Sequence, residues 1–249
     1  MRAIITDLDR TLLHTDKSIS EYTKRILFEC KRRGIAVMAA SARPERTMTD
    51  FHALIGFDAY TALNGAQVVL PGGAMVEYGI LPDSARSILQ RVCAEPDVWI
   101  SVETDAGIFS NRDDAFWKPQ IFDGFPALPP CGKIYKLLFS SPADGFLQKT
   151  AGLLSPDTYS SVAIGTILQV MAQDATKWNG IQAMLRAFSI DPAQAVYFGD
   201  DEDDIEPLRR CGRGVAPSNA IPAALDAADE ITADNDADGV ARWIEENLL

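Results

Sequence analysis

The chain has 249 residues, of which 47% are hydrophobic and 23% charged, a composition typical of a folded globular protein and not of a disordered or fibrous one. Its 23 basic and 35 acidic side chains give a formal net charge of −12, which argues against nucleic acid or an anionic membrane as a partner because no basic surface is available to neutralise phosphates. No apolar run approaches the ~18–20 residues that span a bilayer.

Two further features of the sequence favour a cytoplasmic location. The apolar stretch at 3–5 is interrupted at once by Asp7 and Asp9, so we expect no signal peptide. The 4 cysteines are far apart and form no C-x-x-C pair, which favours free thiols in a reducing compartment.

The first part of the chain alternates between short apolar runs and amphipathic segments. Apolar runs of strand length predict buried strands over 2–6, 35–40 and 59–63. The helix between the first two runs is predicted to begin after Ser20, a plausible N-cap, and to end near Gly34. The next helix is predicted from Pro44 to Gly56. This β-α-β-α-β order predicts an α/β fold with a doubly wound, mostly parallel, Rossmann-like core sheet.

The pattern changes after Asn64-Gly65. Two short strands around Pro71-Gly72-Gly73 predict a hairpin. From Leu81-Pro82 to about Met171 we expect one helix, two strands, a Pro-rich loop over 118–130, a strand over 134–140, a second helix and two more strands. This order differs from that of the core and predicts an inserted α+β domain.

The α/β pattern resumes near the C-terminus. The predicted elements are a helix over 177–188, a strand over 195–198, a short helix over 203–210 and a last helix whose apolar face runs from 240 to 248. Both ends of the chain therefore belong to the core. We expect the core to cover 1–80 and 173–249, and the inserted domain to cover 81–172.

Two carboxylates follow the first predicted strand. Asp7 and Asp9, in the run DLDRT that ends at Thr11, lie at the carboxyl end of a strand, where open α/β sheets bind ligands. A calcium loop that began at Asp7 would need glycine and glutamate where Leu12 and Ser18 stand. A functional pair of carboxylates or a solvated turn remain as explanations.

A second acidic group follows the strand at 195–198. Asp200 and Asp204 are four residues apart, so on a helical turn they lie on one side. Some neighbouring acidic residues are ordinary solvated surface. Converging carboxylates repel one another and need a cation, and a set of hard oxygen ligands suits Mg²⁺.

Lys177 and Ser41 complete the polar candidates in the core. Lys177 lies on the same helical face as Ile181, where a lysine is either a residue at the rim of the core or an ammonium group aimed into a charged site. Ser41 follows the second strand and is either a helix N-cap or a donor to phosphate oxygens. With Mg²⁺ and Lys177 to balance the carboxylates, a phosphate dianion could enter, an aspartate could attack phosphorus, and a second carboxylate could protonate the leaving oxygen.

Taken together, these motifs resemble the haloacid dehalogenase superfamily, specifically its Cof-like phosphatases with a large inserted α/β cap (type IIB). DLDRT at Asp7, SAR at Ser41, Lys177 and GDDEDD around Asp200 occur in the order found in that family. ALNGA, GVAPSNA and the C-terminal DADGVARWIEENL are also similar to the group. The resemblance covers most of the core and little of the insert. It implies a Mg²⁺-dependent cytoplasmic phosphatase for a small phosphorylated metabolite, acting as a monomer or homodimer.

The resemblance implies a role for each matching residue. Asp7 would be the nucleophile, Asp9 the general acid and then the general base, and Ser41 and Lys177 the groups that hold the phosphoryl oxygens. The metal ligands would be Asp7, the backbone carbonyl of Asp9, Asp200 and Asp204, the last directly or through water.

The resemblance also implies a set of substrate-side residues. In the core these are Thr11, which would support the loop, Arg43, and the pair Asn64-Gly65 at the phosphate end of the site. In the insert, the candidate anchors are Asn111, Arg112, Trp117, Lys118, Lys133 and Lys136. Arg112 and Lys118 could bind a second anionic group, or belong to ordinary solvated surface.

This chain departs from the pattern of the family at several positions. Arg10 and Ala42 stand where glycine is usual, Asp203 where asparagine is usual, and Pro217-Ser218 where methionine and glycine are usual. Arg10 could reach the substrate or point to solvent, and solvent is slightly favoured. A phosphomutase or phosphotransferase on the same scaffold and a non-catalytic protein that binds a phosphorylated ligand remain as alternatives. A receiver-type signalling domain fits poorly, because its acceptor aspartate is not on the first strand.

Overall fold

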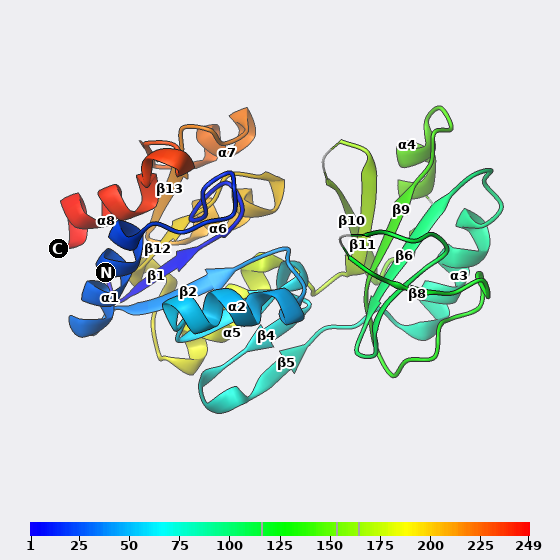
Figure 1. Cartoon of the computed structure of the whole chain (residues 1–249), viewed down its shortest axis with the longest axis horizontal. Coiled ribbons are helices and arrows are strands. Elements are labelled where there is room, and N and C mark those ends of the chain that lie inside the picture. The colour runs from blue at the N-terminus through cyan, green and yellow to red at the C-terminus, as the bar shows by residue number, and fades with distance from the viewer. Residues whose placement is uncertain (116, 153, 164) are drawn as a thin grey trace. The chain divides into compact units, whose positions relative to one another are not determined.

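Figure 1 shows the computed structural model of the chain, which describes residues 1–115, 117–152, 154–163 and 165–249. The chain divides into two compact units. The first unit joins Met1–Glu77 to Thr176–Leu249, and the second is Tyr78–Ala175. The junctions expected at 80/81 and 172/173 lie three residues from these bounds.

The first unit contains an 8-stranded sheet in the order β14-β13-β12-β1-β2-β3-β4-β5. Every pairing from β14 to β3 is parallel, and β4 and β5 add an antiparallel edge. This arrangement confirms the predicted α/β class with a mostly parallel core sheet. The strands are β1 (Ala3–Thr6), β2 (Ala36–Ala40), β3 (Ala59–Ala62), β4 (Gln67–Val69), β5 (Met75–Glu77), β12 (Ala195–Phe198), β13 (Arg213–Pro217) and β14 (Glu230–Thr232).

Helices cover both faces of this sheet (Figure 1). One group packs together as α1, α2 and α8, and the other as α5, α6 and α7. The α-helices are α1 (Glu21–Arg32), α2 (Glu45–Ile55), α5 (Lys177–Ala187), α6 (Ile205–Arg210), α7 (Pro222–Ala227) and α8 (Gly239–Leu248). Short 3-10 turns occur at η1 (Leu63–Gly65), η2 (Pro71–Gly73), η3 (Pro192–Gln194), η4 (Glu202–Asp204) and η5 (Asn235–Ala237).

The start of α1 illustrates how local sequence sets these bounds. The Ser20 side chain accepts a hydrogen bond from the Thr23 backbone N–H at 2.9 Å, which satisfies one of the free N–H groups at the helix start. Gly34 follows the helix with a φ of 77°, a conformation that glycine adopts at little cost. The apolar face, which includes Ile26 and Leu27, is fully buried in the main hydrophobic cluster.

Three elements near the C-terminus are absent from the sequence-based prediction. β13, α7 and β14 have only five, six and three residues, so they are too short for a clear periodic pattern. β13 also ends at Pro217, a residue that lacks the N–H needed to continue a ladder. The short helix predicted over 203–210 divides into η4 and α6.

The second unit has a 6-stranded sheet in the order β10-β11-β9-β6-β7-β8. Its pairings are antiparallel except the one between β7 and β8, so the insert is a mixed sheet. The strands are β6 (Trp99–Thr104), β7 (Gly107–Ser110), β8 (Gln120–Ile121), β9 (Ile134–Ser140), β10 (Thr158–Ala163) and β11 (Ile167–Ala172). The helix α3 (Pro82–Val92) packs on β9, and α4 (Phe146–Ala151) packs on β11. The two-residue strand β8 lies inside the segment that was predicted as a Pro-rich loop.

The order of the sheet in the first unit determines where polar side chains meet. β1 lies between β12 and β2, and all three are parallel. The residues that follow them therefore share one edge of the sheet.

Among the helices in the described part of the chain, none combines the length and the apolar character needed to cross a bilayer.

Candidate active site

Three loops at the carboxyl edge of the parallel sheet bring the candidate residues together. Asp7 directly follows β1, Ser41 directly follows β2, and Asp200 lies two residues beyond β12. All three residues are buried, at 6%, 1% and 3% exposure. The carboxylates of Asp7, Asp200 and Asp204 each place an oxygen within 4.8 Å of the others.

Lys177 lies between two of these carboxylates. Its Nζ donates to Asp7 Oδ1 at 2.9 Å and to Asp204 Oδ1 at 2.6 Å, and its side chain is only 4% exposed. Burial lowers the pKa of Lys177, but the charges of Asp204 and Asp7 outweigh burial and raise it well above its usual value. Lys177 is therefore an ammonium ion inside the site, and not a residue at the rim of the core.

Asp204 is the most heavily hydrogen-bonded of the three carboxylates. Besides Lys177, its Oδ1 accepts from the Tyr197 hydroxyl at 2.5 Å, and its Oδ2 accepts from the backbone N–H groups of Asp200 and Asp201, each at 3.0 Å. Four donors thus occupy both oxygens. Asp204 consequently fixes the ammonium group and the loop after β12, and has little capacity left to bind a metal directly.

Gly199 makes this close packing possible. A Cβ atom added at this position would lie 2.5 Å from both Cβ and Cγ of Asp204. No side chain larger than hydrogen fits there unless Asp204 moves.

Asp200 is held from the loop after β1. The Thr11 hydroxyl donates to Asp200 Oδ1 at 2.6 Å, and Arg10 Nε lies 3.8 Å from Asp200 Oδ2. Burial raises the pKa of Asp200 to about 6, although the Thr11 hydrogen bond opposes this shift. Thr11, predicted on the substrate side, directs its hydroxyl to a carboxylate instead.

The three carboxylates form a donor set that suits a divalent cation. Three buried carboxylates have as cationic neighbours the ammonium group of Lys177 and, 3.8 Å from Asp200, the exposed Arg10, so two cations stand against three carboxylates. The consequence is visible at Asp7, whose pKa is raised well above its usual value by burial, despite the opposing charge of Lys177. Hard oxygen ligands of this kind fit Mg²⁺. Asp7 and Asp200, which have fewer hydrogen-bond donors than Asp204, are the residues that could hold it.

Asp9 lies outside this buried group and has different partners. Nε and Nη2 of Arg43 donate to its two oxygens at 2.6 and 2.7 Å, and Lys17 Nζ lies 2.8 Å from Oδ1. Partial burial raises the pKa of Asp9, but the hydrogen bonds from Arg43 and Lys17 outweigh it and hold the pKa below its usual value. Arg43, predicted to bind substrate, is thus placed as a bidentate partner of Asp9.

Ser41 and Asn64 are linked through their backbones at the ends of β2 and β3. Asn64 N–H donates to the Ser41 carbonyl at 3.0 Å, and the Asn64 amide group donates to Asp203. Asn64 is fully buried and has a φ of 57°. Gly65 packs against the start of α5, because an added Cβ would lie 2.1 Å from the Thr176 carbonyl oxygen. Gly65, and with it the turn that carries Asn64, therefore lies beside the backbone of Thr176 and Lys177.

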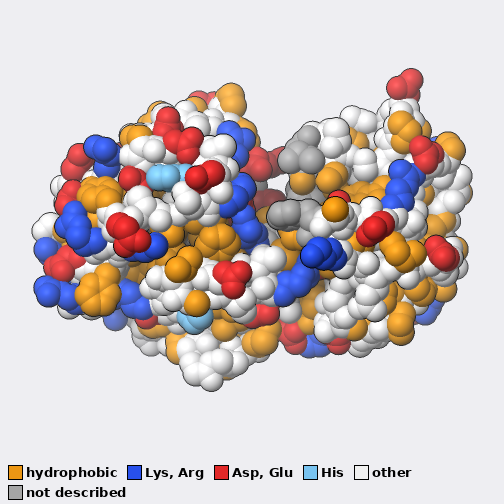
Figure 2. Space-filling model, in the orientation of Figure 1, with side chains coloured by type: hydrophobic (Ala, Val, Ile, Leu, Met, Phe, Trp, Pro, Cys, Tyr) orange, Lys and Arg blue, Asp and Glu red, His pale blue; other side chains and the backbone are white. Residues whose placement is uncertain are grey.

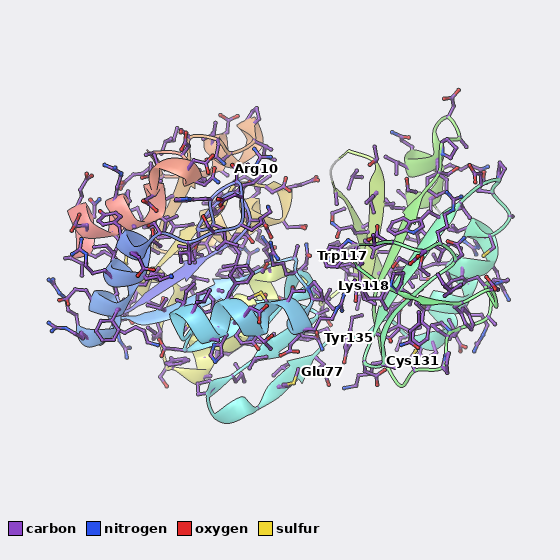
Figure 3. The ribbon with its side chains drawn as sticks, in the orientation of Figure 1. Arg10, Glu77, Trp117, Lys118, Cys131 and Tyr135 are labelled. Atoms are coloured by element: carbon purple, nitrogen blue, oxygen red, sulfur yellow. The ribbon has the colours of Figure 1, made fainter. Side chains whose placement is uncertain are left out.

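Hydrogen bonds connect the loop after β1 to two segments near the C-terminus. Arg10 Nη2 donates to the Asn219 carbonyl at 2.9 Å, and Asn219 Nδ2 donates back to the Arg10 carbonyl at 2.8 Å. The Asn219 side-chain oxygen accepts from the Asn235 N–H at 3.0 Å, and Asn235 Nδ2 donates to the Leu13 carbonyl at 2.9 Å. Figure 3 marks Arg10 on this loop. Asn219, which belongs to GVAPSNA, and Asn235, which directly precedes DADGVA, thus position the loop that carries Asp7 and Asp9.

The candidates in the second unit have partners of their own. Arg112 Nη2 lies 2.5 Å from Asp97 Oδ1, and the Asn111 side chain bonds to the backbones of Ile100 and Val98. Lys118 has a φ of 48° and adjoins Trp117, which is 40% exposed (Figure 3).

Another candidate in this unit, Lys136, is not on the surface. It is 3% exposed, and its Nζ donates to Gln169 Oε1 at 2.9 Å. Asn111 and Lys136 therefore have structural contacts inside the second unit.

Several residues of the site are missing from the sequence-based prediction. Tyr197, Lys17 and Asn219 contact Asp204, Asp9 and Arg10 respectively. Of these three contacts, only that of Tyr197 could have been anticipated from the sequence, since a tyrosine in a fully buried strand needs a partner for its hydroxyl. The contact of Lys17 with Asp9 depends on the path of the loop after β1, and that of Asn219 with Arg10 joins residues 209 positions apart.

The family of the chain follows from a direct comparison with known proteins. The family model for haloacid dehalogenase-like hydrolases matches residues 4–244. The chain therefore belongs to the haloacid dehalogenase-like hydrolases, and it is an enzyme of the hydrolase class with the fold of the Cof-like group. The resemblance found in the sequence is thus confirmed.

The individual relatives have low sequence identity but match most or all of the chain. It is 25% identical over 261 residues to the 5-amino-6-(5-phospho-D-ribitylamino)uracil phosphatase YbjI of Escherichia coli, covering 100% of this chain and 96% of the relative. It is 24% identical to the HMP-PP phosphatase of Cronobacter sakazakii, covering 88% of this chain and 85% of the relative. The solved structure of the subclass IIB sugar phosphatase BT4131 covers 99% of this chain and 98% of its own, with a TM-score of 0.81 at 21% identity.

Proposed function

We propose that this chain is a Mg²⁺-dependent phosphatase that hydrolyses small phosphorylated metabolites through an aspartyl-phosphate on Asp7. The observation that carries the proposal is the buried group of Asp7, Lys177 and Asp200 at the carboxyl edge of β1 and β12. The names of the relatives support a phosphatase, since each acts on a phosphorylated compound according to its name.

In the first step, a carboxylate oxygen of Asp7 attacks phosphorus, and the bond from phosphorus to the leaving oxygen breaks. Lys177 holds Asp7 in place and offers positive charge to the phosphoryl oxygens, with the hydroxyl and backbone of Ser41 on the adjacent strand end. Asp9 gives a proton to the leaving oxygen, so the products are an alcohol and the phosphorylated Asp7. Because Asp9 is paired with Arg43 and Lys17, it has to leave these partners, at least in part, to act as an acid.

In the second step, Asp9 takes a proton from water, which attacks phosphorus and releases inorganic phosphate and the Asp7 carboxylate. A Mg²⁺ ion bound by Asp7, Asp200 and the backbone carbonyl of Asp9 would supply the positive charge that lets a phosphate dianion approach three carboxylates. Asp204, whose oxygens already accept four hydrogen bonds, would act by holding Lys177 and Asp200 in place.

We further propose that the second unit, Tyr78–Ala175, acts as a cap that selects the leaving group. Polar and exposed aromatic side chains in this unit, such as Lys118 and Trp117, are candidates for contacts to it. A sugar phosphate or a related phosphomonoester is the substrate class that this arrangement supports.

The test is a panel of phosphorylated metabolites assayed for phosphate release with Mg²⁺, with EDTA, and with the variants Asp7→Asn and Asp9→Asn. We expect release only with Mg²⁺ and intact Asp7, and we expect Asp9→Asn to accumulate a phosphorylated protein that mass spectrometry detects. Asp16→Asn is a matched control, because Asp16 is fully exposed in the same loop. Release that persists at the normal rate in Asp7→Asn would refute the covalent mechanism. Transfer of the phosphoryl group to a second sugar without free phosphate would instead identify a phosphomutase.

A further inference from the structure

Two cations in the loop after β1 are much more exposed than Lys177. The side chains of Arg10 and Lys17 are 57% and 51% exposed, whereas that of Lys177 is 4% exposed. Neither transfers a proton or contacts the phosphoryl group in the proposed chemistry, although Lys17 pairs with Asp9. We call these two side chains the outer cations.

The outer cations keep most of their hydrogen-bond donors unused. A guanidinium group has five N–H donors. Within the described part of the chain, that of Arg10 makes one hydrogen bond, to the Asn219 carbonyl, while its Nε stands 3.8 Å from Asp200 Oδ2, beyond hydrogen-bonding distance. Lys17 has three N–H donors and pairs with Asp9 alone. Both groups can therefore donate hydrogen bonds to an anionic ligand while they keep their present contacts.

Both cations stand at backbone positions with an unusual conformation. Arg10 has a φ of 61° and Lys17 a φ of 69°, a region that is costly for side chains other than glycine, asparagine and aspartate. Arg10 is further fixed by its reciprocal hydrogen bonds with Asn219. Preorganised cations bind an anion at a smaller entropic cost than mobile surface side chains.

Each outer cation lies beside a carboxylate of the site. Lys17, like Arg43, pairs with Asp9, and Arg10 Nε lies 3.8 Å from Asp200 Oδ2. In the face seen in Figure 2, Lys and Arg side chains, with Asp and Glu beside them, lie over the part of the first unit where Figure 1 places the loop after β1. The outer cations thus offer exposed positive charge next to the buried carboxylates.

We propose that Arg10 and Lys17 bind a second anionic group on the leaving-group side of the substrate. This inference rests on the proposed function and narrows its substrate class to phosphomonoesters that also carry a carboxylate or another phosphate. The phosphoryl group that is transferred meets Lys177, and the second anion meets the outer cations.

The experiment compares matched substrates that differ in the second anion. Glycerol 3-phosphate is compared with 3-phosphoglycerate, and fructose 6-phosphate with fructose 1,6-bisphosphate, so that the two pairs separate a carboxylate from a phosphate. The variants are Arg10→Gly, which also relieves the φ of 61°, Arg10→Lys and Lys17→Met. Arg32→Ala is the control, since Arg32 is an exposed arginine at the far end of α1.

We expect kcat/KM to be higher for the member with the second anion, and we expect Arg10→Gly to reduce this preference about 10-fold or more, the scale of a lost charge-assisted hydrogen bond. Arg10→Lys should restore part of the preference, and Arg32→Ala should leave it unchanged. An equal loss for both members of each pair would overturn the inference, because it would mean that the outer cations act on the phosphoryl group alone.

A binding measurement separates this inference from the proposed function. Calorimetric titration of Asp7→Asn with the same four compounds reports affinity without turnover. A preference for the second anion that disappears in the Asp7→Asn/Arg10→Gly double variant supports the outer cations even if the wild-type chain hydrolyses none of the four. Equal affinity for both members of each pair overturns the inference, whatever the activity assays show.

Discussion

The Nζ atom of Lys177 lies 2.9 Å from Asp7 Oδ1, although 170 positions separate the two residues along the chain. The pair connects the start of α5 to the end of β1 inside a site that excludes most water. Since the site is buried, the loss of Lys177 would leave the carboxylates of Asp7 and Asp204 without their shared counterion in a medium that solvates charge poorly.

Lys177→Met should therefore lower the free energy of unfolding by about 3–5 kcal/mol in the absence of metal, the range found when one partner of a buried ion pair is removed. Urea denaturation in EDTA measures the change. Lys24→Met is the control, because Lys24 pairs with Glu21 on the exposed surface of α1 and such pairs contribute at most about 1 kcal/mol. Equal effects of the two substitutions would contradict the role of Lys177 as a buried counterion.

Tyr197→Phe removes one of the four donors to Asp204. We expect a loss of stability of about 1–3 kcal/mol and a weaker affinity for Mg²⁺, because Asp204 positions the loop that carries Asp200. Calorimetric Mg²⁺ titration and thermal unfolding together test this expectation. Tyr60→Phe also removes a hydroxyl that donates to a carboxylate, that of Glu45 at 3.1 Å, and should leave Mg²⁺ affinity unaltered. A Tyr197→Phe protein with normal Mg²⁺ affinity would show that the tyrosine has only a packing role.

The stability of the metal-free protein should depend on pH through Asp200. Its pKa is about 6 in the folded chain and about 3.9 when unfolded, so between these values the folded state holds a proton that the unfolded state has released. This contribution to stability therefore falls as pH rises from about 4 to about 6. Added Mg²⁺ should act in the opposite direction and stabilise the chain more above pH about 6, where Asp200 is ionised, than below it.

Melting curves from pH 4.5 to 7.5, in EDTA and in Mg²⁺, provide the measurement of this effect. Asp200→Asn should flatten the EDTA profile and remove most of the Mg²⁺ stabilisation. The assignment to Asp200 fails if the variant and the wild type give the same profile.

Gly199→Ala adds only one methyl group but should strongly disrupt the site. The new Cβ would lie 2.5 Å from two atoms of Asp204, so Asp204 would have to leave its four donors. We expect a loss of at least about 2 kcal/mol in stability and little remaining Mg²⁺ binding. Gly152→Ala is the matched control, because its Cβ would meet only backbone oxygens at 3.4 and 3.7 Å. If both variants bind Mg²⁺ normally, the tight packing at Gly199 has no functional consequence.

Arg43→Gln should raise the pKa of Asp9. Two hydrogen bonds from Arg43 contribute to the low pKa of this carboxyl in the wild type, and glutamine replaces a charged partner by a neutral one. An NMR titration of the Asp9 side-chain carbon, assigned through Asp9→Asn, reports the pKa directly. The same midpoint in both proteins would mean that Lys17 alone controls Asp9.

The fold was predictable from the sequence where the elements are long or regular. The alternation of apolar runs with α1 and α2, and the strand β12, predicted the parallel sheet because such strands are buried on both faces. β13 and β14 carry no such signal, since they have only five and three residues and β14 is not buried.

The candidate site, like the fold, was predictable from the sequence only in part. Asp7, Lys177 and Asp200 were identified because each occurs in a recognisable motif at a strand end or helix start. The pairing of Asp9 with Arg43 and Lys17 could not be derived, because it depends on the path of the loop after β1. Arg10 was expected to point to solvent, and its hydrogen bonds to Asn219 depend on a contact across 209 positions.

The pairing of β1 with β12 matters during synthesis of the protein. Ala3 pairs with Ala195 and Thr6 with Phe198, so the central strand gains its second neighbour only after residue 198 has left the ribosome. Contacts between segments so far apart form slowly and late. A nascent chain that ends before Asp200 carries the proposed nucleophile, Asp7, without the second proposed metal ligand, and we expect it to remain inert until the segment that follows β12 has been made.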